Sequence, residues 1–159
     1  MTGERPLAVP ARAWLESRGW TWDEEEDAEG LVMAVRAPTG DEGWSWYLQV
    51  REEHRQVALF TILDTVVPES RLVAMAELVV TASFGLTVGG FELDMEEGQL
   101  RFRTSIGFGA TGVTDEQVRS FLDEMARTNT SMAAAYRPAI ASVLEGRSGS
   151  DAVREVEGS

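Results

Sequence analysis

The glycines within residues 105–114 are the first feature of this sequence that could bind a ligand. The segment SIGFGATGVT contains Gly107-x-Gly109-x-x-Gly112, the spacing of a dinucleotide-binding loop. In such a loop the next helix begins within the glycines, and a parallel strand with an acidic residue follows it. Here the start signal of the helix comes later, at Thr114 and Gln117, which have the spacing of a capping box. The segment is therefore interpreted as a glycine-rich turn, and a small-molecule or nucleotide-binding enzyme using this loop is kept as the alternative.

Other groups for catalysis or metal binding are scarce. The chain has no cysteine, no lysine and a single histidine, His54, which excludes thiolate nucleophiles, Schiff-base lysines and histidine-rich metal sites. Residues 23–29 are acidic, but an EF-hand loop begun at Asp23 would need Gly at Ala28 and Glu at Ala34. This run is interpreted as the solvated end of a hairpin, with weak divalent-ion binding left open. We expect no catalytic residue, no metal site and no cofactor.

The tryptophans are the next candidates for contact with a partner. All five lie in the first third of the chain, at Trp14, Trp20, Trp22, Trp44 and Trp46. Most are interpreted as core side chains. A client-binding patch is the second interpretation, because Trp is enriched at binding hot spots. Stacking of single-stranded bases is a weaker third, because a formal net charge of −13 repels phosphates. We therefore expect no direct nucleic-acid binding.

The elements that would position these residues follow from the apolar periodicity. A helix is predicted over 11–18, strands over 20–26, 31–37, 44–50 and 57–63, a helix from Pro68 to Gly85, a hairpin over 90–106 and a helix from Thr114. Polar residues 127–131 and Pro138 are expected to interrupt this last helix before Gly146. The pattern predicts the α+β class, a mostly antiparallel sheet flanked by helices in the order α-β-β-β-β-α-β-β-α. We expect a flexible N-terminus at 1–9, one domain at 10–146 and a disordered tail at 147–159.

The hairpin over 90–106 has a predicted register. If Glu97 and Gly98 form a two-residue turn, Met95 lies opposite Leu100 and Leu93 lies opposite Phe102. The same register places opposite charges side by side in a structural ladder, pairing Glu92 with Arg103 and Asp94 with Arg101. One face of the hairpin is then apolar and the other charged.

Apolar surface is present in excess. Strands 31–37 and 57–63 are apolar on both faces, and the helix after Pro68 is apolar around most of its circumference. Three helices cover one face of a sheet but not both, so the surplus predicts a second copy of the chain or a partner. The candidates for a dimer interface lie on the helix after Pro68: Leu72, Met75, Ala76, Val79 and Val80. The apolar sheet surface and the tryptophans would then hold an extended segment of a client protein.

Four segments carry a family resemblance: ARAWLESRGW, VALFTIL leading into VPESRLVAMAELVV, GFELDMEEGQLRFRTSI, and TDEQVRSFLDEM with YRPAIASVLEG. In these the chain resembles the YbjN family, small bacterial proteins described as sensory-transduction or stress regulators, whose fold is similar to type III secretion chaperones. The resemblance spans Pro10 to Gly146. It departs at residues 81–83, Thr-Ala-Ser, where relatives often carry Asn. The resemblance implies a non-enzymatic dimer that binds other proteins, and it supplies no catalytic residue.

The residues and the resemblance together predict a homodimeric, chaperone-like adaptor or regulator, acting in a stress response. The acidic surface favours a client that is basic or associated with nucleic acid. No apolar run reaches the roughly 20 residues of a membrane helix, and no signal peptide is recognised, so we expect a cytoplasmic protein without membrane attachment. The sequence leaves open which apolar face forms the dimer and whether helices are exchanged between subunits near Pro138.

Overall fold

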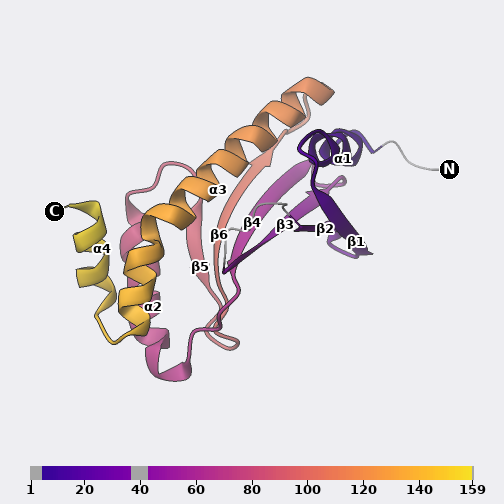
Figure 1. Cartoon of the computed structure of the whole chain (residues 1–159). Helices are drawn as coiled ribbons and strands as arrows, with labels where there is room; N and C mark the ends of the chain where they lie inside the picture. The colour runs from indigo at the N-terminus through magenta and orange to yellow at the C-terminus, as the bar shows by residue number, and fades with distance from the viewer. Residues whose placement is uncertain (1–4, 37–42, 159) are drawn as a thin grey trace.

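A computed structural model describes residues 5–36 and 43–158 of the chain (Figure 1). The elements, in chain order, are α1 (Ala8–Ser17), β1 (Thr21–Asp27), β2 (Gly30–Arg36), β3 (Trp44–Arg51), β4 (Gln56–Leu63), the 3-10 helix η1 (Glu69–Arg71), α2 (Leu72–Phe84), β5 (Gly90–Leu93), β6 (Leu100–Gly107), α3 (Asp115–Leu144) and α4 (Gly149–Glu157). The predicted order is confirmed as far as α3. The last residue of the strand predicted over 31–37 and residues 38–42 of the connection to the next strand lie outside the described residues.

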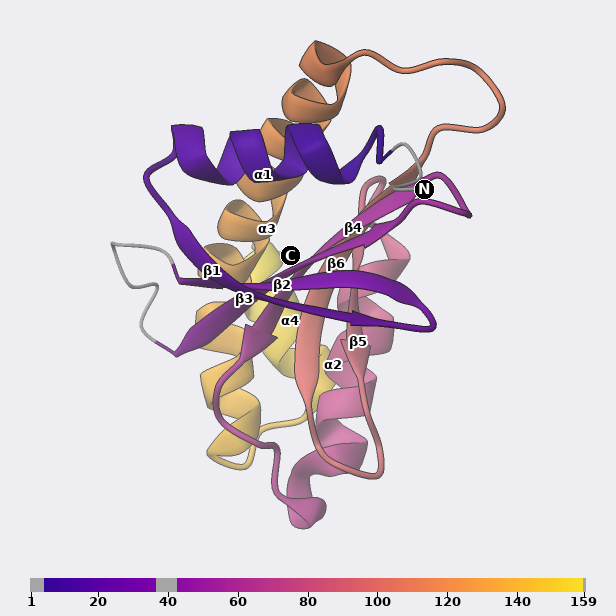
Figure 2. The ribbon, with the colours of Figure 1, turned by 90° about the vertical axis from the view of Figure 1, so that its right-hand side faces the viewer.

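The strands form one antiparallel sheet, which confirms the α+β class. Its order is β1-β2-β3-β4-β6-β5, and every neighbouring pair is antiparallel. Helices α2, α3 and α4 lie on one side of this sheet, and α1 packs near its β1 end against α3 (Figure 1). We call the side that the helices cover the inner face and the opposite side the outer face. Figure 2 shows the strands in front of α2, α3 and α4.

The inner face carries a core of two apolar clusters. The first lies under α1 and includes Trp14, Met33 and Leu48; the second lies between the β5–β6 end of the sheet and helices α2, α3 and α4. Helix α3 contributes to both clusters, with Leu122 in the first and Ile140 in the second. One long helix therefore spans the whole inner face.

Helix α3 is continuous over 30 residues, so the predicted interruption at 127–131 and Pro138 is wrong. Asn129 lies fully buried in the polar run and makes three hydrogen bonds to the sheet. Its amide nitrogen donates to the carbonyl oxygen of Leu59 (3.1 Å) and to Thr61 Oγ1 (3.0 Å), and its oxygen accepts from Thr104 Oγ1 (2.8 Å). Asn129 is thus a partner of the sheet, and its polarity does not interrupt the helix. Pro138 removes only one hydrogen bond from a helix of this length.

The C-terminal residues expected to be a disordered tail form helix α4 instead. The Ser148 side chain caps the helix by accepting a hydrogen bond from the backbone N–H of Asp151 at 3.3 Å. Ala152 and Val153 are buried against the second cluster. A Cβ atom on Gly149 would lie 2.3 Å from the carbonyl oxygen of Ala74, so the absence of a side chain lets α4 approach the backbone of α2. The compact part of the chain therefore extends past Gly146.

The flexible N-terminus predicted for residues 1–9 is also wrong where the structure describes it. Helix α1 begins at Ala8, and Leu7 is buried in the first cluster. The side chain of Glu52, in the β3–β4 turn, accepts hydrogen bonds from the backbone N–H groups of Leu7 (3.0 Å) and Ala8 (2.7 Å). A carboxylate from a distant part of the chain thus satisfies the free donors at the start of α1. Residues 1–4 lie outside the described residues.

The register predicted for the hairpin is wrong by two residues. Leu93 pairs with Leu100 and Glu92 pairs with Arg101, because the connecting loop is longer than the predicted two-residue turn. Asp94, expected to face Arg101, instead accepts hydrogen bonds from the backbone N–H groups of Glu96 and Glu97. A shift of two residues keeps each side chain on its predicted face. The charged face therefore survives, with Glu92 in contact with both Arg101 and Arg103.

Candidate functional site

The outer face of the sheet is left uncovered by the described helices (Figure 2). Because side chains alternate along a strand, the buried residues of β2 and β3 point to the inner face and their neighbours point outward. On β4, Val57, Leu59 and Thr61 point inward, and the buried Ala58 points outward with Phe60 and Ile62. The half-buried apolar side chains of the outer face come from these three strands: Val32, Ala34, Tyr47, Phe60 and Ile62. The expectation that strands 31–37 and 57–63 carry apolar side chains on both faces is confirmed for their described residues.

The two sides of the outer face differ in net charge, although each also holds ion pairs within the chain. Asp23 and Glu25 lie on β1 at one edge, whereas Arg101 and Arg103 lie on β6 at the other side. On the acidic side Asp23 pairs with Arg36 of β2. On the other side Glu92 of β5 contacts both Arg101 and Arg103. The Arg101 guanidinium lies 4.6 Å from the centre of the Phe60 ring, a cation–π geometry. Across the sheet, paired residues form one row: Asp23, Ala34, Tyr47, Phe60 and Arg103. The row therefore runs from an acidic edge through an apolar centre to a cationic side.

A second apolar surface lies on α2. Val73, Val80 and Phe84 point to the same side of the helix and are 78%, 72% and 94% exposed. With the half-buried Ala76 they form what we call the α2 stripe. Exposed apolar side chains in such a row mark contact surfaces more often than scattered ones do.

Only part of the predicted dimer interface is available on α2. Met75 is fully buried in the second cluster, so it cannot contact a partner, and this prediction is wrong. Leu72 and Val79 are partly buried against the same cluster. Ala76 and Val80 belong to the α2 stripe, together with Val73 and Phe84, which were not among the predicted residues.

Three of the five tryptophans proposed for client binding are core residues. Trp14 and Trp46 are buried in the first cluster, and Trp44 is buried in the second. Trp20 lies between Trp14 and Trp46, with ring centres 5.6 and 6.1 Å away. Trp22 is partly buried, and its indole nitrogen donates to Glu24. A tryptophan patch on the surface, whether for a client or for nucleic-acid bases, is therefore not formed.

The glycine loop lacks the geometry of a dinucleotide site. Strand β6, which precedes it, is antiparallel to both of its neighbours, and α3 begins only at Asp115. The guanidinium of Arg55 donates hydrogen bonds to the carbonyl oxygens of Gly109 and Thr111, so these loop carbonyls are turned toward a cation. The predicted capping box is confirmed, with both Thr114–Gln117 hydrogen bonds present. The segment is a turn that leads from β6 into α3.

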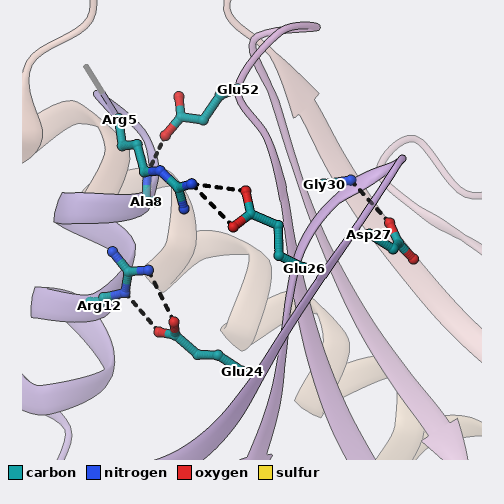
Figure 3. Close-up of polar contacts among 8 residues, drawn as sticks. All are labelled: Arg5, Ala8, Arg12, Glu24, Glu26, Asp27, Gly30 and Glu52. Atoms are coloured by element: carbon teal, nitrogen blue, oxygen red, sulfur yellow. Dashed lines mark hydrogen bonds and ion pairs between the residues drawn. The ribbon is translucent and has the colours of Figure 1, made fainter. Parts of the chain in front are cut away.

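Within the acidic run 23–29, Glu24 and Glu26 form ion pairs with α1 and the residues just before it (Figure 3). Arg12 donates two hydrogen bonds to Glu24, at 2.7 and 3.0 Å, and Arg5 donates two to Glu26, at 2.9 and 3.1 Å. The hydrogen bonds from Arg12 hold the pKa of Glu24 below its usual value. Asp27 accepts hydrogen bonds from the backbone of the β1–β2 turn. Within residues 5–36 and 43–158, no three acidic or histidine side chains are placed to hold a metal ion.

The surface also carries hollows outside these contacts. One lies beside the α1–β1 contact and is lined by Arg5, Glu26, Glu52 and the exposed His54, which also lies on the β3–β4 turn. No described helix is long and apolar enough to cross a membrane. The surfaces with the composition of a binding site are therefore the outer face and the α2 stripe. The alternation of Ser45, Tyr47 and Gln49 with buried tryptophans was the sequence signal for the outer face.

A family model and a solved structure of the same family agree with this architecture. Residues 12–138 match the model of the YbjN family, described as "Putative bacterial sensory transduction regulator". No curated protein matches the chain. The crystal structure of YbjN from E. coli is similar, with 18% identity, a TM-score of 0.57 and coverage of 82% of this chain and 93% of that chain. A chain of the HopA1-SchA chaperone-effector complex aligns with 15% identity, a TM-score of 0.43 and coverage of 79% and 88%.

Proposed function

Since this chain belongs to the YbjN family, we propose that it is a non-enzymatic regulator that acts by binding other proteins, and that it works as a homodimer. The observation that carries the proposal is the pair of apolar surfaces, the outer face and the α2 stripe, that its own described helices leave uncovered. Exposure of each apolar surface to water is unfavourable unless another protein surface covers it. Two separate surfaces provide one contact for a second copy and one for a partner protein.

The two surfaces are placed so that both can be occupied together. Helix α2 lies on the inner side of the sheet, so the sheet separates the α2 stripe from the outer face (Figure 1). A protein bound at one surface does not block the other. This arrangement suits an adaptor, which must keep its own assembly while it holds a partner.

The charge of the chain limits the class of partner. With a formal net charge of −13, long-range electrostatics favour a basic protein, including one that itself binds nucleic acid. The aromatic ring of Phe84 would supply the buried anchor of the contact, as aromatic side chains do at hot spots. We place the protein in the cytoplasm, as expected from the sequence, and in a stress response, as the family resemblance implies.

The test is affinity capture from the native cell with matched surface variants. Phe84→Glu removes the α2 stripe and Tyr47→Glu removes the centre of the outer face, whereas Thr65→Glu adds the same charge at an exposed loop residue. We expect at least one protein to bind the parent chain and Thr65→Glu but not one of the surface variants. That protein, purified, should bind the purified chain in isothermal titration calorimetry and lose at least tenfold in affinity with the same variant.

Two results would contradict the proposal. If the captured proteins are the same for all variants, neither surface is a partner site. If the purified chain turns over a substrate while every surface variant behaves as the parent, the chain is an enzyme and the adaptor function is wrong.

A further inference from the structure

We infer that the outer face binds the outer face of a second copy of this chain, about a two-fold axis that runs along β3. The inference rests on the proposed homodimer and adds the surface that forms it. The candidates chosen from the sequence lie on the helix after Pro68, although the sequence left open which apolar face forms the dimer. The α2 stripe is then left to the partner protein.

The row of side chains across the outer face is complementary to itself. It begins with Asp23 on β1, continues through Ala34, Tyr47 and Phe60, and ends with Arg103 on β6. An interface with two-fold symmetry uses the same patch on both copies, so each patch must contain its own complement. With the axis along β3, Asp23 lies opposite Arg103 of the second copy, Ala34 lies opposite Phe60, and Tyr47 meets its own equivalent.

The difference in net charge between the two sides also favours one direction of the axis. An axis in the plane between the copies and parallel to the strands places the acidic edge of one sheet over the arginines of the other. An axis perpendicular to the strands would instead place β1 over β1, with Asp23 and Glu25 facing their own equivalents. Like charges in contact across an interface oppose binding, so the parallel axis is favoured.

The area of the two surfaces favours the outer face for a stable pair. Five strands spaced about 4.8 Å apart and about six residues long cover on the order of 500 Å² for each copy, near the lower limit of specific interfaces. The α2 stripe lies on a helix about 20 Å long and 10 Å wide, on the order of 200 Å². The half-buried apolar centre and charged rim of the outer face are also typical of an interface that exchanges rather than an obligate one.

Charge reversal gives the sharpest test. Asp23→Arg and Arg103→Glu each place like charges opposite one another in a dimer of the variant with itself. In an equimolar mixture of the two variants, both contacts again pair an arginine with a carboxylate. Arg36→Ala is the matched control, because it breaks the intrachain pair between Arg36 and Asp23 without placing like charges across the proposed interface.

Sedimentation velocity between 1 and 100 μM, in 50 mM and 500 mM salt, measures the association. We expect the parent chain and Arg36→Ala to form dimers at 50 mM salt with at least threefold weaker association at 500 mM. Each charge reversal should weaken association at least tenfold, and the mixture should restore it. Phe84→Glu should leave it unchanged.

Three results would overturn the inference. If Phe84→Glu abolishes the dimer and the charge reversals do not, the α2 stripe forms it, and the proposed adaptor function still stands. If both reversals weaken the dimer but the mixture fails to restore it, the copies do not meet in this register. If the parent chain is a monomer at 100 μM, this inference and the homodimer of the proposed function are both wrong, and partner capture then tests only the binding of another protein.

Discussion

Replacing Asn129 by alanine tests whether α3 is held on the sheet by a satisfied polar contact. The change removes all three hydrogen bonds of the buried amide and leaves the hydroxyls of Thr61 and Thr104 facing an apolar side chain. Both threonines are almost fully buried, at 0% and 1% exposure. A buried polar group left without a partner costs about 1–3 kcal/mol. Two hydroxyls near the lower limit of this range and the small cavity left by the shorter side chain together should lower the free energy of unfolding by about 3 kcal/mol.

Urea unfolding followed by tryptophan fluorescence measures this loss. The denaturation midpoint should fall with an unchanged slope, and the melting temperature should drop by roughly 6–12 °C for a chain of this length. The control is the triple variant Asn129→Ala, Thr61→Val, Thr104→Val, in which the stranded hydroxyls are replaced by methyl groups of the same shape. We expect it to be more stable than Asn129→Ala alone. If it is equally unstable or worse, the cavity dominates, and the reasoning from unsatisfied groups is refuted.

Two further expectations concern titration. Burial and the hydrogen bond to Glu157 raise the pKa of Tyr136 to about 12. The protonated phenol therefore stabilises the folded protein fully below about pH 10, the usual tyrosine value, and this contribution is lost as pH rises through 12. Absorbance at 295 nm should show one tyrosine that ionises late and is missing in Tyr136→Phe, and ionisation of both tyrosines near pH 10 would contradict this. The pKa of Glu24 is lowered by its hydrogen bonds with Arg12, so the stabilisation is present above about pH 4.5 and is lost as pH falls. Glu24→Gln should reduce the difference in unfolding free energy between pH 7 and pH 3, and an unchanged difference would refute the assignment.

The strands and the sheet class could be predicted because they depend on local alternation. In β3 every second residue from Trp44 to Val50 is buried, and the same period is visible in the sequence. The capping box at Thr114 was equally local, since both of its hydrogen bonds join residues three apart. Signals of this kind need no knowledge of the rest of the fold.

The errors occurred where distant parts of the chain decide the structure. Asn129 looks like a helix breaker until Thr61 and Thr104 of the sheet are placed beside it. The residues of α4 look like a polar tail, because Ala152 and Val153 become core residues only once α2 and α3 form the surface that they cover. The hairpin register failed for the same reason: the carbonyl oxygen of Gly98 accepts a hydrogen bond from Val67, which precedes η1.

For the candidate surfaces, the sequence indicated the presence of surplus apolar area but not its location. It could not tell which side of α2 faces the core, so it selected the buried Met75 and omitted Phe84. It also could not show that the acidic edge and the arginines of β6 lie at opposite ends of one row, because the strand order places β6 next to β4. Strand order is a property of the assembled sheet, so no short sequence pattern reveals it.

Helix α3 also determines how the molecule unfolds. Leu122 and Ile140 lie 18 positions apart on this helix, a rise of about 27 Å, and each is buried in a different apolar cluster. Because α3 packs in both clusters, disrupting one cluster also weakens the packing of this helix in the other. The two halves of the molecule should consequently unfold in one cooperative transition, without an intermediate in which only one cluster remains folded.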